Sequence, residues 1–389
     1  MMTMTMNKKL LLLTLSVVLQ ACNHLDNYML GKDNTPAPAA LEPIKTKVAL
    51  KEKWSVPVSA KTTNANLKLK PAIVANVVYT ADTSGSIEAV EKASGQLLWS
   101  KKLPHSIVSG PSVAAGSIAL GTDSSSVVLL KQTDGSELWT AKVSSEVLSK
   151  PVITGSKVIA KTIDGNLYAL DLVTGKTLWV SEHGAPSLIL KASSSPVVVG
   201  NKLVLVGYSD GKMDAVDLET GRLVWQRSIA YASGASDVER LVDIDADPII
   251  RGNVAYLASY QGYVGALSLV DGQFLWRKPA SVYKNMAIDD NTLYLTDSDD
   301  VVWAINRQNG QVNWKQVALK ARGLTEPVLM GNRVVVGDKT GLLHVLAKSN
   351  GNLISRAQLG GAITTAPSIS SNNIYVMTNN GKLNRFSVS

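Results

Sequence analysis

The sequence holds few of the side chains from which catalytic and metal sites are usually built. Its histidines lie far apart, and their spacing matches no metal-ligand pattern: His24, His105, His183 and His344. The only cysteine, Cys22, excludes an intrachain disulfide and any site made of several thiolates. The motifs GxSxG, P-loop and HExxH do not occur. We therefore expect no metal, no cofactor and no catalytic residue.

Two groups of aspartates raise the question of calcium binding or proton transfer. The stretch DIDADP at 243–248 resembles the start of an EF-hand loop. That loop needs Gly where Pro248 stands and Glu at its twelfth position, where Val254 stands. The second group surrounds one expected strand and is typical of turns: Asp289, Asp290, Asp297, Asp299 and Asp300. A calcium site or an acid–base carboxylate pair is the weaker interpretation of both.

The stretch NKKLLLLTLSVVLQAC at 7–22 has the layout of a secretory signal. Two lysines precede an apolar run over 10–19, which is too short to cross a bilayer core about 30 Å thick. The run ends in LQAC, which resembles the bacterial lipobox, whose cysteine becomes the lipidated first residue of the mature protein. The resemblance predicts lipidation of Cys22, with Gln20 as a departure from the pattern. The alternative is an ordinary signal peptide with a chance cysteine.

These features divide the chain into three segments. Residues 1–21 are expected to be the lipoprotein signal peptide, and 22–47, which is rich in proline, the lipidated cysteine with a flexible tether. Asn23 stands where Asp would indicate retention in the inner membrane, so the outer membrane is favoured. Residues 48–389 hold no second apolar run of membrane-spanning length and are expected to fold as one domain.

The folded segment is built on a repeated phrase in which a turn glycine precedes tryptophan by four positions. VTGKTLW at 173–179 and TGRLVW at 220–225 are two copies. The tryptophans are Trp54, Trp99, Trp139, Trp179, Trp225, Trp276 and Trp314. A further copy, NGNLIS at 350–355, carries Ser355 instead of tryptophan. Periods of about 40–50 residues with strand patterning indicate a β-propeller.

The copies also predict how the propeller closes. Glycine suits the tight hairpin turn, and tryptophan covers apolar area where one twisted sheet packs on the next. Eight inner strands surround Gly85, Ser125, Gly165, Gly211, Gly262, Asp300, Gly341 and Gly381. An outer strand at Trp54 precedes all of them, and the last inner strand, 381–389, has no outer strand after it. We therefore expect an all-β, eight-bladed propeller of four-stranded blades, closed by pairing of the first strand with the C-terminal blade.

The net charge and its distribution along the sequence do not indicate a particular class of binding partner. The formal net charge is +8, and the lysines and arginines are scattered without a run of five like charges. A mildly basic, solvated surface is the expectation, and no nucleic-acid site.

The repeat itself points to one class of enzyme that must be weighed. ALDLVTGKTLW at 169–179 matches the AxDxxTGxxxW repeat of pyrroloquinoline-quinone dehydrogenases, and 215–225 matches equally well. That repeat is a packing motif and says nothing about a cofactor. The alcohol-oxidising members carry adjacent cysteines beside the quinone, and no cysteine is free for that role here. A quinoprotein dehydrogenase and another periplasmic binding propeller remain the alternative functions.

Lipobox, tether and eight such blades together resemble the BamB family, lipoproteins of the β-barrel assembly machinery in the Gram-negative outer membrane. Two local stretches add to the resemblance: PSLILK at 186–191 is similar to the family's PSLxLR loop, and RLVDID at 240–245 to its RLxDxD stretch. The resemblance implies that a set of five residues binds the periplasmic POTRA domains of the central subunit BamA. They are Leu188, Leu190, Lys191, Asp243 and Asp245.

The chemistry of these residues agrees with that implication. A loop between blades can expose two leucines as apolar anchors, with Lys191 and the aspartates supplying charge complementarity. Lys191 replaces arginine, which keeps the charge but loses the bidentate fork. The alternatives are a buried outer strand for 187–191 and a capped turn for 243–245. The resemblance implies a non-enzymatic scaffold, anchored to the outer membrane and facing the periplasm, that assists folding and insertion of β-barrel proteins. Two mechanisms stay open: orienting the POTRA domains, or offering a surface to unfolded client chains by strand addition.

Overall fold

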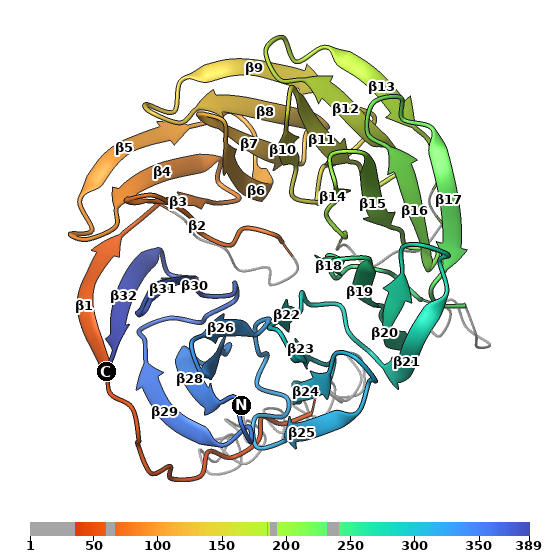
Figure 1. Cartoon of the computed structure of the whole chain (residues 1–389). Coiled ribbons are helices and arrows are strands. Elements are labelled where there is room, and N and C mark those ends of the chain that lie inside the picture. Colours follow the sequence, from red (N-terminus) through yellow and green to blue (C-terminus); the bar gives the residue numbers. More distant parts are fainter. Residues whose placement is uncertain (1–35, 60–66, 185, 187–192, 232–240) are drawn as a thin grey trace, which may run out of the picture. The chain divides into compact units, whose positions relative to one another are not determined.

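The chain folds into a ring of eight β-sheets, seen face-on in Figure 1. The computed structural model describes residues 36–59, 67–184, 186, 193–231 and 241–389. Within these ranges, all regular elements are β-strands, and no helix is long and apolar enough to cross a membrane. The predicted eight-bladed propeller is confirmed.

Each blade is an antiparallel sheet of four strands, and the blades are numbered here in chain order. Blade 1 consists of β2 (Ala72–Val74), β3 (Val77–Ala81), β4 (Ser86–Glu91) and β5 (Leu97–Lys102), and blade 2 of β6 (Ile107–Ala114), β7 (Ser117–Thr122), β8 (Ser126–Lys131) and β9 (Glu137–Lys142). Blade 3 consists of β10 (Val152–Thr154), β11 (Lys157–Lys161), β12 (Leu167–Asp171) and β13 (Thr177–Ser181), and blade 4 of β14 (Val197–Val199), β15 (Leu203–Gly207), β16 (Lys212–Asp217) and β17 (Leu223–Ser228).

The other half of the ring repeats this pattern, with β1 taken from the start of the chain. Blade 5 consists of β18 (Ile249–Arg251), β19 (Val254–Ala258), β20 (Gly262–Ser268) and β21 (Phe274–Ala280), and blade 6 of β22 (Ala287–Ile288), β23 (Thr292–Thr296), β24 (Val302–Asn306) and β25 (Val312–Gln316). Blade 7 consists of β26 (Val328–Met330), β27 (Arg333–Gly337), β28 (Leu342–Ala347) and β29 (Leu353–Gln358), and blade 8 of β30 (Ser368–Ser370), β31 (Asn373–Thr378), β32 (Lys382–Val388) and β1 (Leu50–Pro57).

The ring closes through the two ends of the folded unit. Strand β1 pairs antiparallel with β32, in a register that runs from Leu50 opposite Val388 to Pro57 opposite Lys382. Figure 1 shows the two strands side by side at the rim of blade 8. The predicted closure is therefore confirmed, and it removes two sheet edges that would otherwise be open to pairing with other chains.

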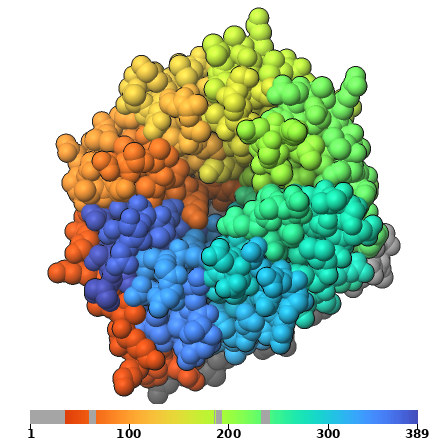
Figure 2. All heavy atoms as spheres, viewed as in Figure 1, coloured from red at the N-terminus to blue at the C-terminus, as the bar shows by residue number. Residues whose placement is uncertain are grey.

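The core is divided among the interfaces between blades. In the described part of the chain, eight clusters of buried apolar side chains each join two neighbouring sheets. Between blades 3 and 4, for example, Ile159 and Leu167 pack with Val204 and Val216. The space-filling view shows the blades packed side by side around a hollowed centre (Figure 2).

The repeated glycine and tryptophan are partners across these interfaces. A Cβ atom on Gly175 would lie 2.7 Å from Cδ2 of Trp139, which belongs to the preceding blade. The Trp139 indole N–H donates to the carbonyl of Leu172 in the same turn, at 3.0 Å. Glycine is thus required twice, because its φ is +70° and because the indole leaves no room for a side chain.

The contact recurs around the ring. A Cβ on the turn glycine would lie within about 3 Å of the preceding blade's indole in the pairs Trp54–Gly95, Trp99–Gly135, Trp139–Gly175, Trp179–Gly221, Trp276–Gly310 and Trp314–Gly351. Trp225 differs, because the Arg227 guanidinium lies over Gly272 instead.

Ser355 is explained by the closure. It lies on β29 of blade 7, and the third and fourth strands of blade 8 are β32 and β1, which no turn connects. A tryptophan at 355 would have no turn glycine to cover. The segment that precedes β1 fills this interface instead. Val48 packs with Ile354, and the Lys47 N–H donates to the Ile354 carbonyl at 2.8 Å.

The folded unit begins earlier than the predicted boundary at residue 48. The compact unit starts at Ala39. The Ala39 N–H donates to the Lys320 carbonyl at 2.9 Å, and the Arg322 guanidinium donates to the Ala39 carbonyl at 3.0 Å. Part of the segment predicted as a tether therefore lies against the propeller, because its backbone groups find partners there.

The packing of tryptophan on glycine can be measured with a matched pair of substitutions. Gly351 and Gly116 have nearly equal φ, +72° and +73°, but a Cβ would lie 2.5 Å from Trp314 at the first position and touch nothing within 4 Å at the second. We expect Gly116→Ala to cost about 1–2 kcal/mol through backbone strain alone. Gly351→Ala should cost about 1–3 kcal/mol more. Equal urea midpoints for the two variants would contradict this account.

Closure can be tested by deletion. Removing residues 50–57 exposes an edge of β32, whereas removing 23–34 leaves every described contact intact. We expect the first deletion to lower the free energy of unfolding by more than about 3 kcal/mol and the second to have little effect. Circular dichroism melts of the two proteins make the comparison, and coincident melting curves would refute the role of β1.

Candidate functional site

The segment LVDIDADP at 241–248 connects two neighbouring blades in an extended conformation and leads into β18. The Ile244 N–H donates to the carbonyl of Tyr208 after blade 4's second strand, at 3.1 Å. The Tyr260 N–H of blade 5 donates to the carbonyl of Asp243, at 2.9 Å. The segment is therefore held at both sides by backbone hydrogen bonds, and we call it the bridging segment.

Apolar residues and aspartates alternate along the bridging segment, and both sets are buried. Val242, Ile244 and Ala246 are all buried, and Ile244 packs so closely on Gly207 that a Cβ there would lie 2.4 Å from its Cγ2. Apolar residues at every second position are the pattern of an extended chain with one face in the core.

Asp243 and Asp245 occupy the other face, and they are not at the surface. Their exposed fractions are 0 and 2%. The sequence suggested charged groups on an exposed loop, and this placement is wrong, because the segment crosses the inner ends of the blades with protein on both sides. Their part in partner binding stays a prediction, and the burial makes that part indirect.

A buried lysine, Lys161, and a half-buried lysine, Lys68, act on these aspartates. Lys161, on β11, is buried and donates to the Gly207 carbonyl at 2.6 Å. Burial lowers the pKa of the Lys161 ammonium to about 8, although Asp245 opposes the shift. Burial and the neighbouring charge of Asp243 raise the pKa of the Asp245 carboxyl to about 7, against the opposing effect of Lys68. The two groups are therefore a buried pair with charges of opposite sign, and burial disfavours the charged form of each.

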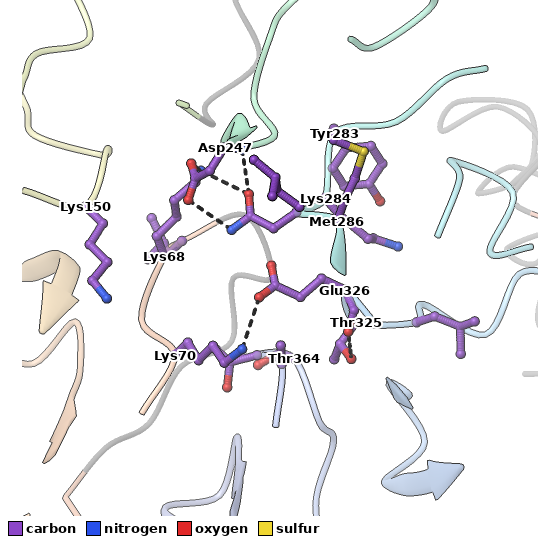
Figure 3. Close-up of a pocket in the computed structure, with 16 residues that line it drawn as sticks. Lys68, Lys70, Lys150, Asp247, Tyr283, Lys284, Met286, Thr325, Glu326 and Thr364 are labelled. Carbon is purple, nitrogen blue, oxygen red and sulfur yellow. Dashed lines mark hydrogen bonds and ion pairs between the residues drawn. The ribbon is translucent and has the colours of Figure 1, made fainter. Parts of the chain in front are cut away.

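Lys68 ties the end of the bridging segment to blade 1. Its ammonium forms an ion pair with Asp247, and Figure 3 shows the two side chains beside each other. The same ammonium donates to the carbonyl of Asp245 at 2.9 Å. The amide of Asn285 adds a hydrogen bond to the Asp247 carboxylate at 3.1 Å. These contacts fix the position of the segment from the centre of the ring.

A histidine that stood alone in the sequence is part of a second network. The Nδ1 atom of His183 lies 2.7 Å from Asp214, its Nε2 atom lies 3.1 Å from Asp210, and its ring stacks on Tyr208 at a centroid distance of 3.6 Å. Burial alone would lower the pKa of His183, but the hydrogen bonds to Asp210 and Asp214 raise it to about 9. His183 is thus a cation at neutral pH, paired with two carboxylates.

The two stretches singled out in the sequence meet at their flanks. Tyr208 stacks on His183, which precedes the first stretch, and accepts the Ile244 N–H of the second. The Ser195 N–H, which follows the first stretch, donates to Asp247 at 2.6 Å. Leu188, Leu190, Lys191 and Cys22 lie outside the described residues.

Asp289 and Asp297 of the second group have the predicted role of turn residues. Asp289 accepts from the Thr292 N–H at 2.8 Å, and Asp297 from the Val301 N–H at 2.9 Å. Both cap turns. Asp300 differs, because it is buried, pairs with Lys284 at 2.9 Å and accepts from the Leu324 N–H at 3.0 Å. Within the described ranges, no three His, Cys, Asp or Glu side chains gather as metal ligands.

Comparison with known proteins gives a consistent result. A family profile described as outer membrane protein assembly factor BamB matches residues 83–316 and 317–389. The chain is 61% identical over 385 residues to outer membrane protein assembly factor BamB of Legionella pneumophila (strain Paris), covering 99% of this chain and 100% of the relative. The crystal structure of BamB from Moraxella catarrhalis superposes with a TM-score of 0.79 at 27% identity, covering 87% of this chain and 100% of that one. A europium-containing methanol dehydrogenase has a TM-score of 0.69 at 13% identity and covers 85% of this chain and 83% of its own, which shows a shared fold alone.

The burial of Asp245 predicts a pH dependence that one substitution removes. Because its pKa in the folded protein, about 7, lies well above the ordinary aspartate pKa of about 4, the folded protein keeps a proton that the unfolded chain has lost. Its contribution to stability is therefore lost as pH rises from about 4 to about 7. Between pH 5 and pH 8, the wild type should lose about 2–3 kcal/mol relative to Asp245→Asn. Urea unfolding at the two pH values measures this, and His183 titrates in both proteins and cancels. Parallel pH profiles would show that Asp245 is ionised throughout.

Proposed function

The chain belongs to the family of outer membrane protein assembly factor BamB, and from this membership we propose that it is a lipid-anchored scaffold that docks on the POTRA domains of BamA. In this proposal Cys22 carries the lipid that holds the protein at the outer membrane, facing the periplasm. The propeller takes part in the folding and insertion of β-barrel proteins without catalysing a reaction.

The observation that carries the proposal is the position of two connections on either side of blade 4, one between β13 and β14 and the other between β17 and β18. Two stretches that resemble the family's partner-binding motifs are about fifty residues apart in the sequence. Their flanks are joined by the stack of His183 on Tyr208 and by the Ser195–Asp247 hydrogen bond. A surface whose loops are held in a fixed relation before binding loses less entropy when the partner arrives.

The residues have two different roles in this proposal. Leu188 and Leu190 are apolar anchors for the partner, and Lys191 supplies a charge beside them. Asp243 and Asp245 are buried and act on the partner indirectly. The electrostatic interaction of their carboxylates with Lys161 and Lys68 holds the bridging segment in place. They are positioning residues.

The quinoprotein alternative is supported only by the shared fold, since the identity to the dehydrogenase is 13%. Absorbance of the purified protein after addition of quinone and calcium distinguishes it, and the scaffold proposal expects no bound-quinone spectrum.

The docking proposal is tested by a leucine substitution with a control on the neighbouring blade. We expect Leu190→Ala to weaken binding to the POTRA domains of BamA by about 1–3 kcal/mol, because an apolar anchor is lost. Leu178→Ala, at a β13 position that is 49% exposed, should bind like the wild type. Lys191→Arg should bind equally well or better if a carboxylate faces it. The full chain is titrated with the POTRA domains, and circular dichroism melts accompany each variant. Normal binding by Leu190→Ala, or a loss explained by early melting, would mean that Leu190 is a core residue.

A further inference from the structure

The centre of the ring contains a cavity of about 340 Å³ (Figure 3). Its walls come from the segments that precede the innermost strands of six blades. Four lysines but only two carboxylates line it: Lys68, Lys70, Lys150, Lys284, Asp247 and Glu326. The cavity therefore has an excess of positive charge, and the partner of each lysine matters.

Three of the lysines are neutralised by carboxylates. Lys68 pairs with Asp247. Lys284 forms an ion pair with Asp300 at 2.9 Å, outside the cavity lining. Lys70 lies 3.6 Å from Glu326, which is an ion pair longer than a hydrogen bond.

Lys150 is the exception. Within the described residues, its ammonium forms no hydrogen bond and no ion pair, whereas its backbone N–H donates to the Ser195 hydroxyl at 3.1 Å and fixes the stem. Burial lowers the pKa of this ammonium, and the nearby charges of Lys70 and Lys68 act in the same direction, against Asp247 and Glu326. An ammonium held in such a place without a counter-ion is unfavourable.

A second polar group in the same lining is also unused. Thr365 is 5% exposed, and its hydroxyl has no hydrogen-bond partner among the described residues. A buried hydroxyl without a partner costs about 1–3 kcal/mol. One cavity thus contains an unpaired cation, which can donate directly to an oxygen that carries negative charge. An unpaired hydroxyl lies in the wall of the same cavity, but its oxygen is covered, so it donates to a ligand only after the Thr365 side chain rotates about χ1.

We propose that the central cavity binds a small oxyanion, a carboxylate or a phosphate, with Lys150 as its counter-ion and Thr365 as a hydrogen-bond donor. Hydrogen bonds between charged groups and oxyanions are among the strongest that proteins form. The volume falls at the lower end of the range of small-molecule sites, about 300–1,000 Å³, and so admits an anion with more than one acidic group. The site is independent of the docking proposal, although Lys68 links its wall to the bridging segment.

The test is calorimetric titration of the full chain in detergent, at low ionic strength so that screening is weak. Two probes are used separately, inorganic phosphate and citrate, and their relative affinity distinguishes phosphate from carboxylate chemistry. We expect at least one probe to bind with a stoichiometry of one. Lys150→Met should weaken that binding at least about tenfold, because it removes the charge and keeps the apolar stem. Thr365→Val should weaken it less, and Lys150→Arg should restore most of it.

Lys53→Met is the matched control, since Lys53 is exposed on β1 at the rim. It should bind the probe like the wild type. Melting curves without probe check the folding of each variant, and Thr365→Val, which is nearly isosteric, provides a second test if Lys150→Met is unstable. Absence of binding by the wild type at about 10 mM of either probe would overturn the proposal. So would equal affinity of the wild type and folded Lys150→Met and Thr365→Val variants.

Discussion

The pairing of β1 with β32 is the constraint on which the rest of the structure depends. Seven blades can form from consecutive strands, but the eighth needs a strand from the other end of the chain. Once that strand is in place, every sheet has a neighbour on both sides, and each interface buries its own apolar cluster. The central cavity exists only in the closed ring, because its walls come from six blades.

Charge is concentrated where the inner ends of the blades meet. The bridging segment brings Asp243 and Asp245 against Lys161, and its end at Asp247 pairs with Lys68. Buried charges of this kind contribute little net stability, because desolvation offsets their attraction. These charges instead fix the position of the bridging segment, because moving the aspartates away from the lysines would leave buried charges without partners. The bridging segment and the central cavity both include contacts of Lys68 and Asp247.

Much of the fold could be predicted because the repeat encodes it locally. Turn glycines and tryptophans recur at blade spacing, and their count showed that one outer strand must come from the N-terminus. Ser355 stood out in the sequence as an exception, but its reason is topological: blade 8 has no turn for a tryptophan to cover. The burial of Asp243 and Asp245 was missed, since acidic residues before a strand usually cap a turn. The partners of His183 gave no sequence signal, because Asp210 and Asp214 lie about thirty residues further along the chain, in blade 4.

Photo-crosslinking in the assembled membrane complex tests the central claim that the protein docks through the two connections on either side of blade 4. A photoreactive amino acid replaces Leu188 in one protein, and replaces Leu98 or Leu138, which are 48 and 49% exposed on blades 1 and 2, in two others. The account predicts a crosslink to the periplasmic domains of BamA from position 188 and none from the two rim positions. Crosslinks from position 98 or 138 without one from 188 would contradict it.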